Sequence, residues 1–290
     1  MKLLHVLVLA LAGTICVPAL PAAELSFEYD RARPLDLKET SSRKVGDASV
    51  REVDYAALEG RNAATIISRE PATDPRSAIL FVHWYGPPSP TSNRTQFIPD
   101  ALALAQDGAI SLLINTPWSD PEYFHRRTRE GDYARSVQEV KELRRALDLL
   151  LSLPQVDPAR VAMVGHDFGA MYGTLAAACD NRTKAFVFMA GTQSFSDWFL
   201  YGKPRLAGKE RQDFVDQFAP LDPVRWLPKL KVPILFQFAD HDEHVRAERA
   251  TALVAAANGP KTVRAYSTDH ALNTEATRDR IAWLKKTLAK

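Results

Sequence analysis

The chain has 290 residues, a hydrophobic share of 46%, a charged share of 25% and a formal net charge of +2. These values are typical of a globular protein with enough material for one large α/β domain. The near-neutral charge argues against a nucleic-acid-binding or membrane-surface protein, so we expect neither nucleic acid nor a stable membrane contact as a partner. Composition indicates neither the oligomeric state nor the function.

The N-terminal segment differs from the rest of the chain. A basic start at Met1-Lys2 is followed by an apolar run over residues 3–17, and small residues, among them Ala22 and Ala23, precede Glu24. This pattern is typical of a secretory signal peptide and is too short for a spanning helix. We therefore expect a signal peptide over residues 1–23 and a secreted or periplasmic mature chain, with an uncleaved anchor as the alternative.

The mature chain would hold a single cysteine. Cys16 would leave with the signal peptide, so Cys179 could not form an intramolecular disulfide. It lies in a run of small residues with helical character, where we expect a buried structural thiol. Stability is therefore expected to come from the hydrophobic core.

Short apolar runs alternate with longer amphipathic stretches, a pattern that predicts an α/β fold with a mostly parallel sheet. The expected strands cover residues 48–58, 63–68, 78–82, 109–114, 160–164, 185–189, 232–238 and 262–266. The expected helices cover residues 96–106, 133–153, 246–257 and 275–288, with one more directly after Gly169. Residues 116–132 are expected to form a loop, and residues 191–231 a small lid-like insertion in a single domain over 24–290.

The sequence Gly165-His166-Asp167-Phe168-Gly169 directly follows the apolar run that ends at Val164. An apolar run, then Gly-x-nucleophile-x-Gly, then small residues is typical of a sharp strand–turn–helix that exposes the central side chain above a sheet. Flanking glycines are needed because the turn is tight. The central residue is usually serine, and here it is aspartate.

This pattern resembles the α/β-hydrolase superfamily over essentially the whole mature chain. The framework is most similar to dienelactone-hydrolase-like and prolyl-oligopeptidase-like members, on the basis of residues 156–161, Pro233-Ile234-Leu235 and the absence of a large cap. The resemblance implies an α/β-hydrolase fold with helices on both faces of the sheet. It also implies a catalytic triad in the chain order nucleophile, acid, histidine.

The resemblance assigns the other two triad members. Asp242, just past an expected strand, is the acid, with Asp240 as the fallback. His270, between the last strand and the last helix, is the base. The histidines at 241 and 244 are a weak metal signal, so no metal is expected, and no cofactor is expected because triad hydrolysis needs only water.

An oxyanion hole in this superfamily uses two backbone N–H groups. Phe168 supplies one by its position after the nucleophile, and the second is expected from Tyr85, with Trp84 next. Trp84 stands where related chains often have glycine. His83 and His166, inside these two motifs, are expected to be packing or supporting groups.

Aspartate at the elbow changes the expected chemistry. A carboxylate can attack an sp³ carbon that bears a leaving group and form an alkyl ester, which histidine-activated water then hydrolyses. Members with aspartate here include haloalkane dehalogenases and epoxide hydrolases, which implies a small-molecule epoxide or carbon–halogen substrate. Phe168 lacks the indole N–H with which dehalogenases bind the halide, and Trp84 is a candidate substitute. For the paired tyrosines of epoxide hydrolases, the insertion offers Tyr201, with Trp198 nearby.

Two other functions stay open from the sequence. In the first, the protein is an esterase or other acyl hydrolase in which Asp167 is a general base. In the second, it is a catalytically silent binding protein on the same scaffold. The presence of Asp242 and His270 in the expected order argues against a silent protein.

Overall fold

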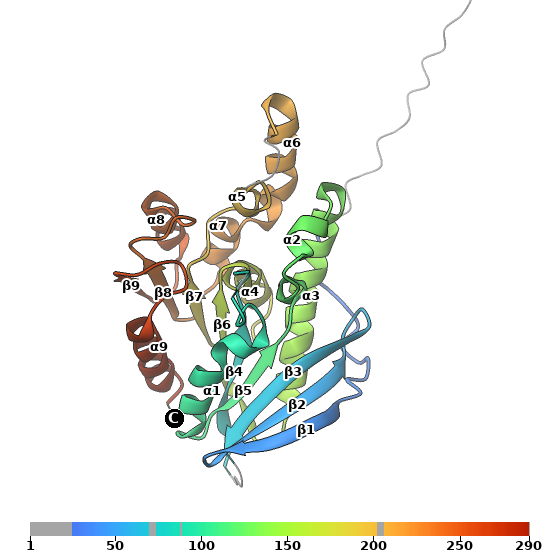
Figure 1. Cartoon of the computed structure of the whole chain (residues 1–290), viewed down its shortest axis with the longest axis vertical. Coiled ribbons are helices and arrows are strands. Elements are labelled where there is room, and N and C mark those ends of the chain that lie inside the picture. Colours follow the sequence, from blue (N-terminus) through green and yellow to red (C-terminus); the bar gives the residue numbers. More distant parts are fainter. Residues whose placement is uncertain (1–24, 70–73, 88, 202–205, 290) are drawn as a thin grey trace, which may run out of the picture.

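The computed structural model describes residues 25–69, 74–87, 89–201 and 206–289, so the expected signal peptide lies outside the described residues and stays a prediction. One nine-stranded sheet runs through the molecule in the order β1-β2-β3-β5-β4-β6-β7-β8-β9 (Figure 1). The strands are β1 Lys38–Val45, β2 Ala48–Ala56, β3 Arg61–Arg69, β4 Arg76–Val82, β5 Ile110–Ile114, β6 Val156–His166, β7 Ala185–Met189, β8 Ile234–Ala239 and β9 Lys261–Tyr266.

The sheet is mostly parallel, as expected. Strands β1, β2 and β3 pair antiparallel, β3 pairs antiparallel with β5, and β4 to β9 run parallel to their neighbours. Side chains alternate between the two faces of each strand. In β4, Leu80 therefore joins one hydrophobic core and Ile79 and Phe81 join the other.

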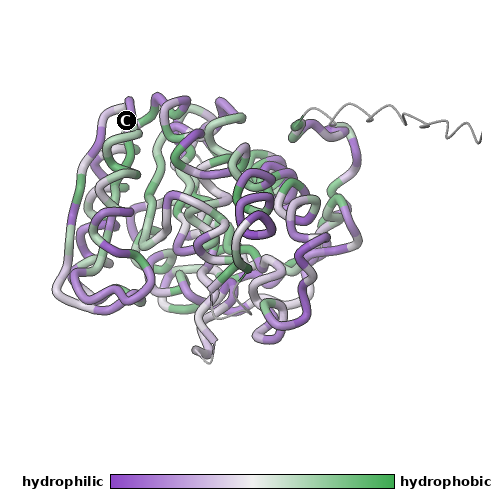
Figure 2. The backbone as a smooth tube through the Cα atoms, turned by 90° about the horizontal axis from the view of Figure 1, so that it is seen from above, coloured by the Kyte–Doolittle hydropathy of each residue, from purple (hydrophilic) through white to green (hydrophobic). Residues whose placement is uncertain are grey.

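Helices cover both faces of the sheet. Helices α3, α4 and α8 contribute to the core on one face, and α1 and α9 to the core on the other. Seen from above, hydrophobic stretches run through the interior, and much of the outer path of the chain is hydrophilic (Figure 2). The α-helices are α1 Ile98–Ala105, α2 Tyr123–Arg126, α3 Arg129–Ser152, α4 Phe168–Ala178, α5 Phe195–Phe199, α6 Gly208–Phe218, α7 Pro223–Trp226, α8 Ala247–Ala256 and α9 Thr274–Thr287.

Three expectations were wrong in detail. Strand β1 was not expected, because all eight of its residues are exposed and none forms a buried apolar stripe. The segment 116–132 is not one loop, since it contains α2, a short 3-10 turn at Pro117–Ser119 and the first turn of α3. Cys179 is half-buried rather than fully buried, and its thiol donates to the carbonyl of Ala176 at 3.5 Å.

The segment between β7 and β8 corresponds to the expected insertion. It contributes α5, α6 and α7, which lie on the upper side of the molecule in Figure 1, with α6 projecting farthest. Phe195, Phe199 and Phe218 of this segment are buried in the same core as α4. The insertion is thus packed against the domain. Among the described residues, no helix is long and apolar enough to cross a membrane.

The turn between β6 and α4 requires both of its glycines. A Cβ atom on Gly165 would lie 2.3 Å from the carbonyl oxygen of Gly169, and one on Gly169 would lie 2.4 Å from that of Val82. Such distances are far inside van der Waals contact, and the opposing atoms are backbone. Helix α4 can therefore start close to the end of β4. The residues that follow β4, His83 to Gly86, are called the Tyr85 loop below.

Candidate active site

Asp167 occupies the tip of this turn. Its backbone has φ 56° and ψ −120°, a left-handed conformation that is strained for a residue with a side chain. Its N–H donates to the carbonyl of Met189 at 2.9 Å, so the end of β7 holds the turn in place. The side chain is completely buried. The expected elbow is present, and its central side chain is shielded from water.

Asp242 and His270 lie within hydrogen-bond distance of each other. His270 follows β9, and its Nδ1 donates to Oδ2 of Asp242 at 2.8 Å. The other carboxylate oxygen of Asp242 accepts the backbone N–H groups of His244 and Val245 at 2.8 and 2.9 Å. Burial raises the pKa of Asp242, but the bond from His270 and these N–H groups outweigh burial and lower it overall. Asp242 is therefore ionised and orients the imidazole.

Burial and charge act in opposite directions on the other two groups. Burial raises the pKa of Asp167 to about 7, although His270 and the backbone N–H of Tyr85 favour its ionised form. Burial lowers the pKa of His270, but the hydrogen bond to Asp242 and the negative charge of Asp167 outweigh burial and raise it overall. Each group thus stabilises the charge of the other.

The backbone of the Tyr85 loop points directly at the elbow. The N–H of Tyr85 donates to Oδ2 of Asp167 at 3.0 Å, and hydrogen bonding from the N–H of Phe168 also lowers the pKa of that carboxyl. The N–H of Tyr85, expected to form one half of the oxyanion hole, therefore binds the carboxylate of the protein itself. Tyr85 was preferred over Trp84 as the second backbone donor from the sequence, and its N–H lies next to the Asp167 carboxylate.

Trp84 does not act as a donor toward Asp167. Its backbone N–H donates to Oε1 of Gln96 at 2.9 Å and its indole N–H donates to the carbonyl of Thr91 at 3.3 Å. With both N–H groups bound elsewhere, it fits neither the oxyanion hole nor a leaving-group site. Its ring instead stacks on His166, with centroids 5.1 Å apart and an 8° angle.

A chain of hydrogen bonds fixes the backbone of His270. Nε2 of Gln96 lies 2.6 Å from Nδ1 of His166. On the other side of the ring, Nε2 of His166 lies 3.0 Å from the carbonyl oxygen of His270. Because a carbonyl only accepts, Nε2 of His166 carries the proton and Nδ1 accepts from Gln96. Burial lowers the pKa of His166 well below its usual value, so the ring stays neutral. His166 is a supporting group, as its position suggested.

His83 supports the loop in a similar way. Its Nδ1 lies 2.7 Å from the carbonyl of Trp84, and its Nε2 accepts the backbone N–H of Thr116 at 3.1 Å. Burial lowers the pKa of His83 to about 4, so this ring is also neutral. The bonds connect the ends of β4 and β5 under the Tyr85 loop.

Four buried polar atoms around the site have no hydrogen-bond partner among the described residues. They are Oδ1 of Asp167, Nε2 of His270, Nε1 of Trp198 and Nδ1 of His244. The ring of Trp198 lies 5.6 Å from those of both Phe168 and His270, and 5.4 Å from that of His244. Buried polar groups are rarely left unpaired, so this group of unpaired atoms marks where a substrate or water would bind.

Two participants were missed or undervalued in the sequence. Gln96 lies in an expected helix with no motif around it, and its role depends on long-range packing. Trp198 was noted only as a neighbour of Tyr201, which is half-exposed beside His244. The fallback acid Asp240 is exposed at the end of β8, and the part of the chain that the structure describes contains no group of three or more potential metal ligands.

The raised pKa of Asp167 predicts a pH-dependent stability. The folded state holds this proton up to about pH 7, whereas an unfolded aspartate loses it near pH 4, so the group's contribution is complete below about pH 4 and is lost as the pH rises through about 7. Asn cannot lose this proton, so the unfolding free energy of Asp167→Asn should rise relative to that of the wild type as the pH increases from about 4 to about 8. We expect this difference to grow by at least about 1 kcal/mol. Urea unfolding at a series of pH values measures the difference.

The matched control for this experiment is Asp213→Asn, on the exposed side of α6 beside Lys209. Its unfolding free energy should stay close to that of the wild type, because the side chain is exposed. A difference for Asp167→Asn that is constant or shrinks with rising pH would contradict the assigned burial of this carboxyl.

A model of the prolyl oligopeptidase family (peptidase family S9) matches residues 97–289, more than half of the chain. No curated protein sequence matches the chain. Among solved structures, the chain is similar to an acetyl xylan esterase from Paenibacillus sp. R4, with a TM-score of 0.73, 17% identity and coverage of 88% of this chain and 90% of the other.

Two further solved structures show the same fold at low identity. Acetyl xylan esterase 1 from Thermoanaerobacterium sp. JW/SL YS485 has a TM-score of 0.69 and 15% identity, covering 90% of each chain. A protein from Klebsiella pneumoniae described as a dienelactone hydrolase has a TM-score of 0.62 and 16% identity, covering 84% of this chain and 99% of the other. Because the family model covers more than half of the chain, the chain belongs to the prolyl oligopeptidase family and is a hydrolase with the α/β-hydrolase fold.

Proposed function

We propose that the protein hydrolyses a small organic molecule through a covalent ester of Asp167. The observation that carries the proposal is the bond from the N–H of Tyr85 to Oδ2 of Asp167, at 3.0 Å. In a serine hydrolase, such a donor is free to receive the oxygen of the substrate's carbonyl group. Here the carboxylate occupies it, which favours a reaction in which the tetrahedral centre forms on Asp167 itself.

The first step is a displacement at carbon. Oδ2 is held by the backbone N–H of Tyr85, whereas Oδ1 is unpaired and is the oxygen available to attack. Its attack on an sp³ carbon forms the carbon–oxygen bond of an alkyl ester, and the electron pair of the broken bond leaves with a halide or an epoxide oxygen. No proton needs to be removed from this nucleophile, provided that Asp167 is ionised.

The second step uses the histidine. Nε2 of His270 is unpaired, and Nδ1 is held by Asp242, so the ring is oriented to take a proton from water. The resulting hydroxide attacks Cγ of Asp167, and the negative charge that develops on Oδ2 lies against the N–H of Tyr85. Collapse of this centre breaks the bond from Cγ to Oδ1, and His270 returns its proton to Oδ1, so the product leaves as an alcohol that keeps the original Oδ1. One oxygen from water stays in the carboxylate, and the remaining proton of that water goes to the solvent or, for an epoxide, to the alkoxide oxygen formed in the first step.

Trp198 is the proposed donor for the leaving group. Phe168 has no polar hydrogen, and the indole N–H of Trp84 donates to Thr91. The indole N–H of Trp198 is buried and unpaired, and its ring lies against Phe168 and His270. A donor in this position stabilises a halide or an epoxide oxygen as it takes up negative charge, so we propose an epoxide or carbon–halogen substrate.

Acyl hydrolysis is the second candidate, because two of the similar solved structures are acetyl xylan esterases. In that reaction Asp167 would act as a general base, which its pKa of about 7 would suit. The carboxylate would also have to leave the donor of Tyr85 before a substrate carbonyl could bind there. This required movement makes acyl hydrolysis the weaker proposal.

Substitution of the nucleophile tests the proposal. The wild type and Asp167→Ala would be assayed with aryl esters, styrene-type epoxides and short haloalkanes, read out by colour, diol formation and halide release. We expect epoxide or halide turnover in the wild type and a loss of at least about a thousandfold in the variant, because the bond-forming atom is removed.

A Cys179→Ala variant, altered outside the site, should retain the wild-type rates. Ester turnover that survives Asp167→Ala would contradict a role for this carboxylate, and ester turnover lost in the variant would support the general-base reaction instead.

The leaving-group donor has its own test. Trp198→Phe removes the indole N–H and keeps an aromatic ring, so we expect a roughly hundredfold fall in kcat for epoxides or haloalkanes. The matched control is Trp226→Phe, also in the insertion, whose indole N–H donates to the carbonyl of Pro220. Equal kcat values for the two variants would show that Trp198 does not stabilise the leaving group.

A further inference from the structure

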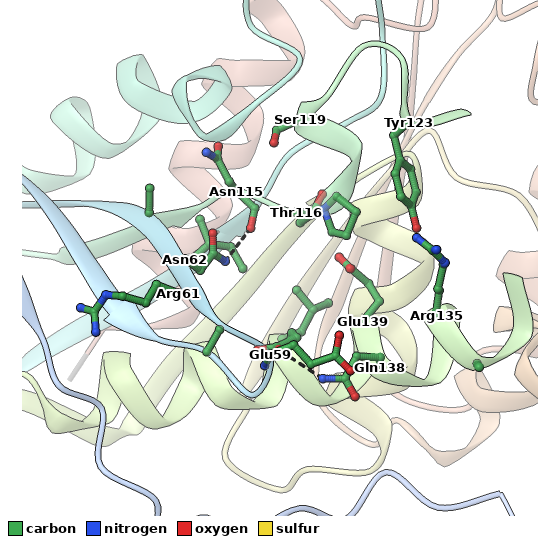
Figure 3. Close-up of a pocket in the computed structure, with 17 residues that line it drawn as sticks. Glu59, Arg61, Asn62, Asn115, Thr116, Ser119, Tyr123, Arg135, Gln138 and Glu139 are labelled. Atoms are coloured by element: carbon green, nitrogen blue, oxygen red, sulfur yellow. Dashed lines mark hydrogen bonds between the residues drawn. The ribbon is translucent and has the colours of Figure 1, made fainter. Parts of the chain in front are cut away.

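A cavity of about 830 Å³ lies away from the proposed reaction centre. Its walls come from the start of β3, the segment that follows β5, α2 and one side of α3 (Figure 3). None of Asp167, Asp242 and His270 lines it. The volume is that of a small-molecule site, and the reaction proposed for Asp167 makes no use of this cavity.

Glu139 of α3 points into this cavity and lacks a partner. Its side chain is labelled in Figure 3, directed toward the strand ends and away from Arg135. The residue is only 5% exposed, and no described group donates a hydrogen bond to its carboxyl. A buried carboxyl without a partner costs stability, so a structural role does not explain it.

Two other charged residues of the wall, Glu142 and Arg61, are already engaged. Glu142 accepts the backbone N–H groups of Leu58 and Glu59, both at 3.0 Å, and thereby holds the turn before β3. Arg61 lies 2.6 Å from Asp36 and is also paired with Asp54. Neither Arg61 nor Arg135, the two arginines of the wall, forms an ion pair with Glu139 among the described residues.

The remaining lining suits a small organic group. Ile114, Pro117, Leu143 and Ala134 provide apolar surface, and the ring of Tyr123 stands at one side, where it can face a positive charge (Figure 3). Burial, with repulsion from Glu142, raises the pKa of Glu139 to about 8. The carboxyl is therefore mostly protonated at neutral pH, and a cation beside it would favour loss of that proton.

We propose that this cavity binds a primary organic ammonium ion, with Glu139 as its counter-ion and the apolar wall around its hydrocarbon part. The ammonium group supplies the hydrogen-bond donors and the positive charge that the protein does not provide. A neutral alcohol of the same shape offers one donor and no charge. The proposal is independent of the chemistry at Asp167.

The test uses benzylammonium chloride as the cationic probe and benzyl alcohol as its neutral counterpart. Isothermal titration of the full chain at about pH 7, in two buffers with different heats of ionisation, gives the affinity and the number of protons exchanged. We expect the wild type to bind benzylammonium at least about tenfold more tightly than benzyl alcohol, with release of close to one proton.

Glu139→Gln keeps the shape of the side chain and removes its charge, so we expect about a tenfold loss of affinity for benzylammonium and no proton release. The matched control is Glu130→Gln, an exposed substitution on the same helix that should bind as the wild type does. Circular dichroism verifies folding, and the comparison of the two probes needs no variant. No binding by the wild type, equal binding of the two probes, or unchanged binding by Glu139→Gln would each overturn the proposal.

Discussion

The hydrogen bond from the backbone N–H of Tyr85 to Asp167 is the interaction on which the proposed chemistry depends. It joins the loop after β4 to the turn after β6, and it holds one carboxylate oxygen so that the other stays unpaired. Backbone donors hold their position through the fold itself, so the geometry exists before any substrate binds. A buried carboxyl of this kind is costly, as its raised pKa indicates, and functional sites are where such costs are retained.

A second set of contacts holds the histidine in relation to that carboxylate. Gln96 accepts a hydrogen bond from the backbone N–H of Trp84 and is hydrogen-bonded to His166, which in turn donates to the carbonyl of His270. The residue that replaces the usual glycine of the loop is therefore part of the support, since the ring of Trp84 stacks on His166. The same loop also carries Tyr85, whose N–H donates to Asp167. One connected set of residues therefore positions both this donor and the backbone of His270.

The sequence predicted the parts of the fold that are governed by burial. Strands such as β4 are continuous apolar runs because both faces are covered, and the elbow is visible because two glycines are sterically required. Strand β1 could not be predicted in this way, because its residues are exposed and it pairs with β2 without forming a buried apolar face. Asp242 and His270 were found through their order in the chain, and the structure brings them within 2.8 Å. Gln96 and Trp198 have no local pattern, since their positions depend on contacts between distant segments.

The most direct measurement is a single turnover in heavy-oxygen water, followed by mass spectrometry of the peptide that contains Asp167. Enzyme in excess over a substrate that it turns over limits each molecule to one reaction. A covalent ester predicts that one heavy oxygen enters the Asp167 carboxylate and that the alcohol product stays unlabelled, because hydroxide attacks Cγ. Heavy oxygen in the product, with an unlabelled Asp167, would show that water attacks the substrate directly and would contradict the covalent mechanism.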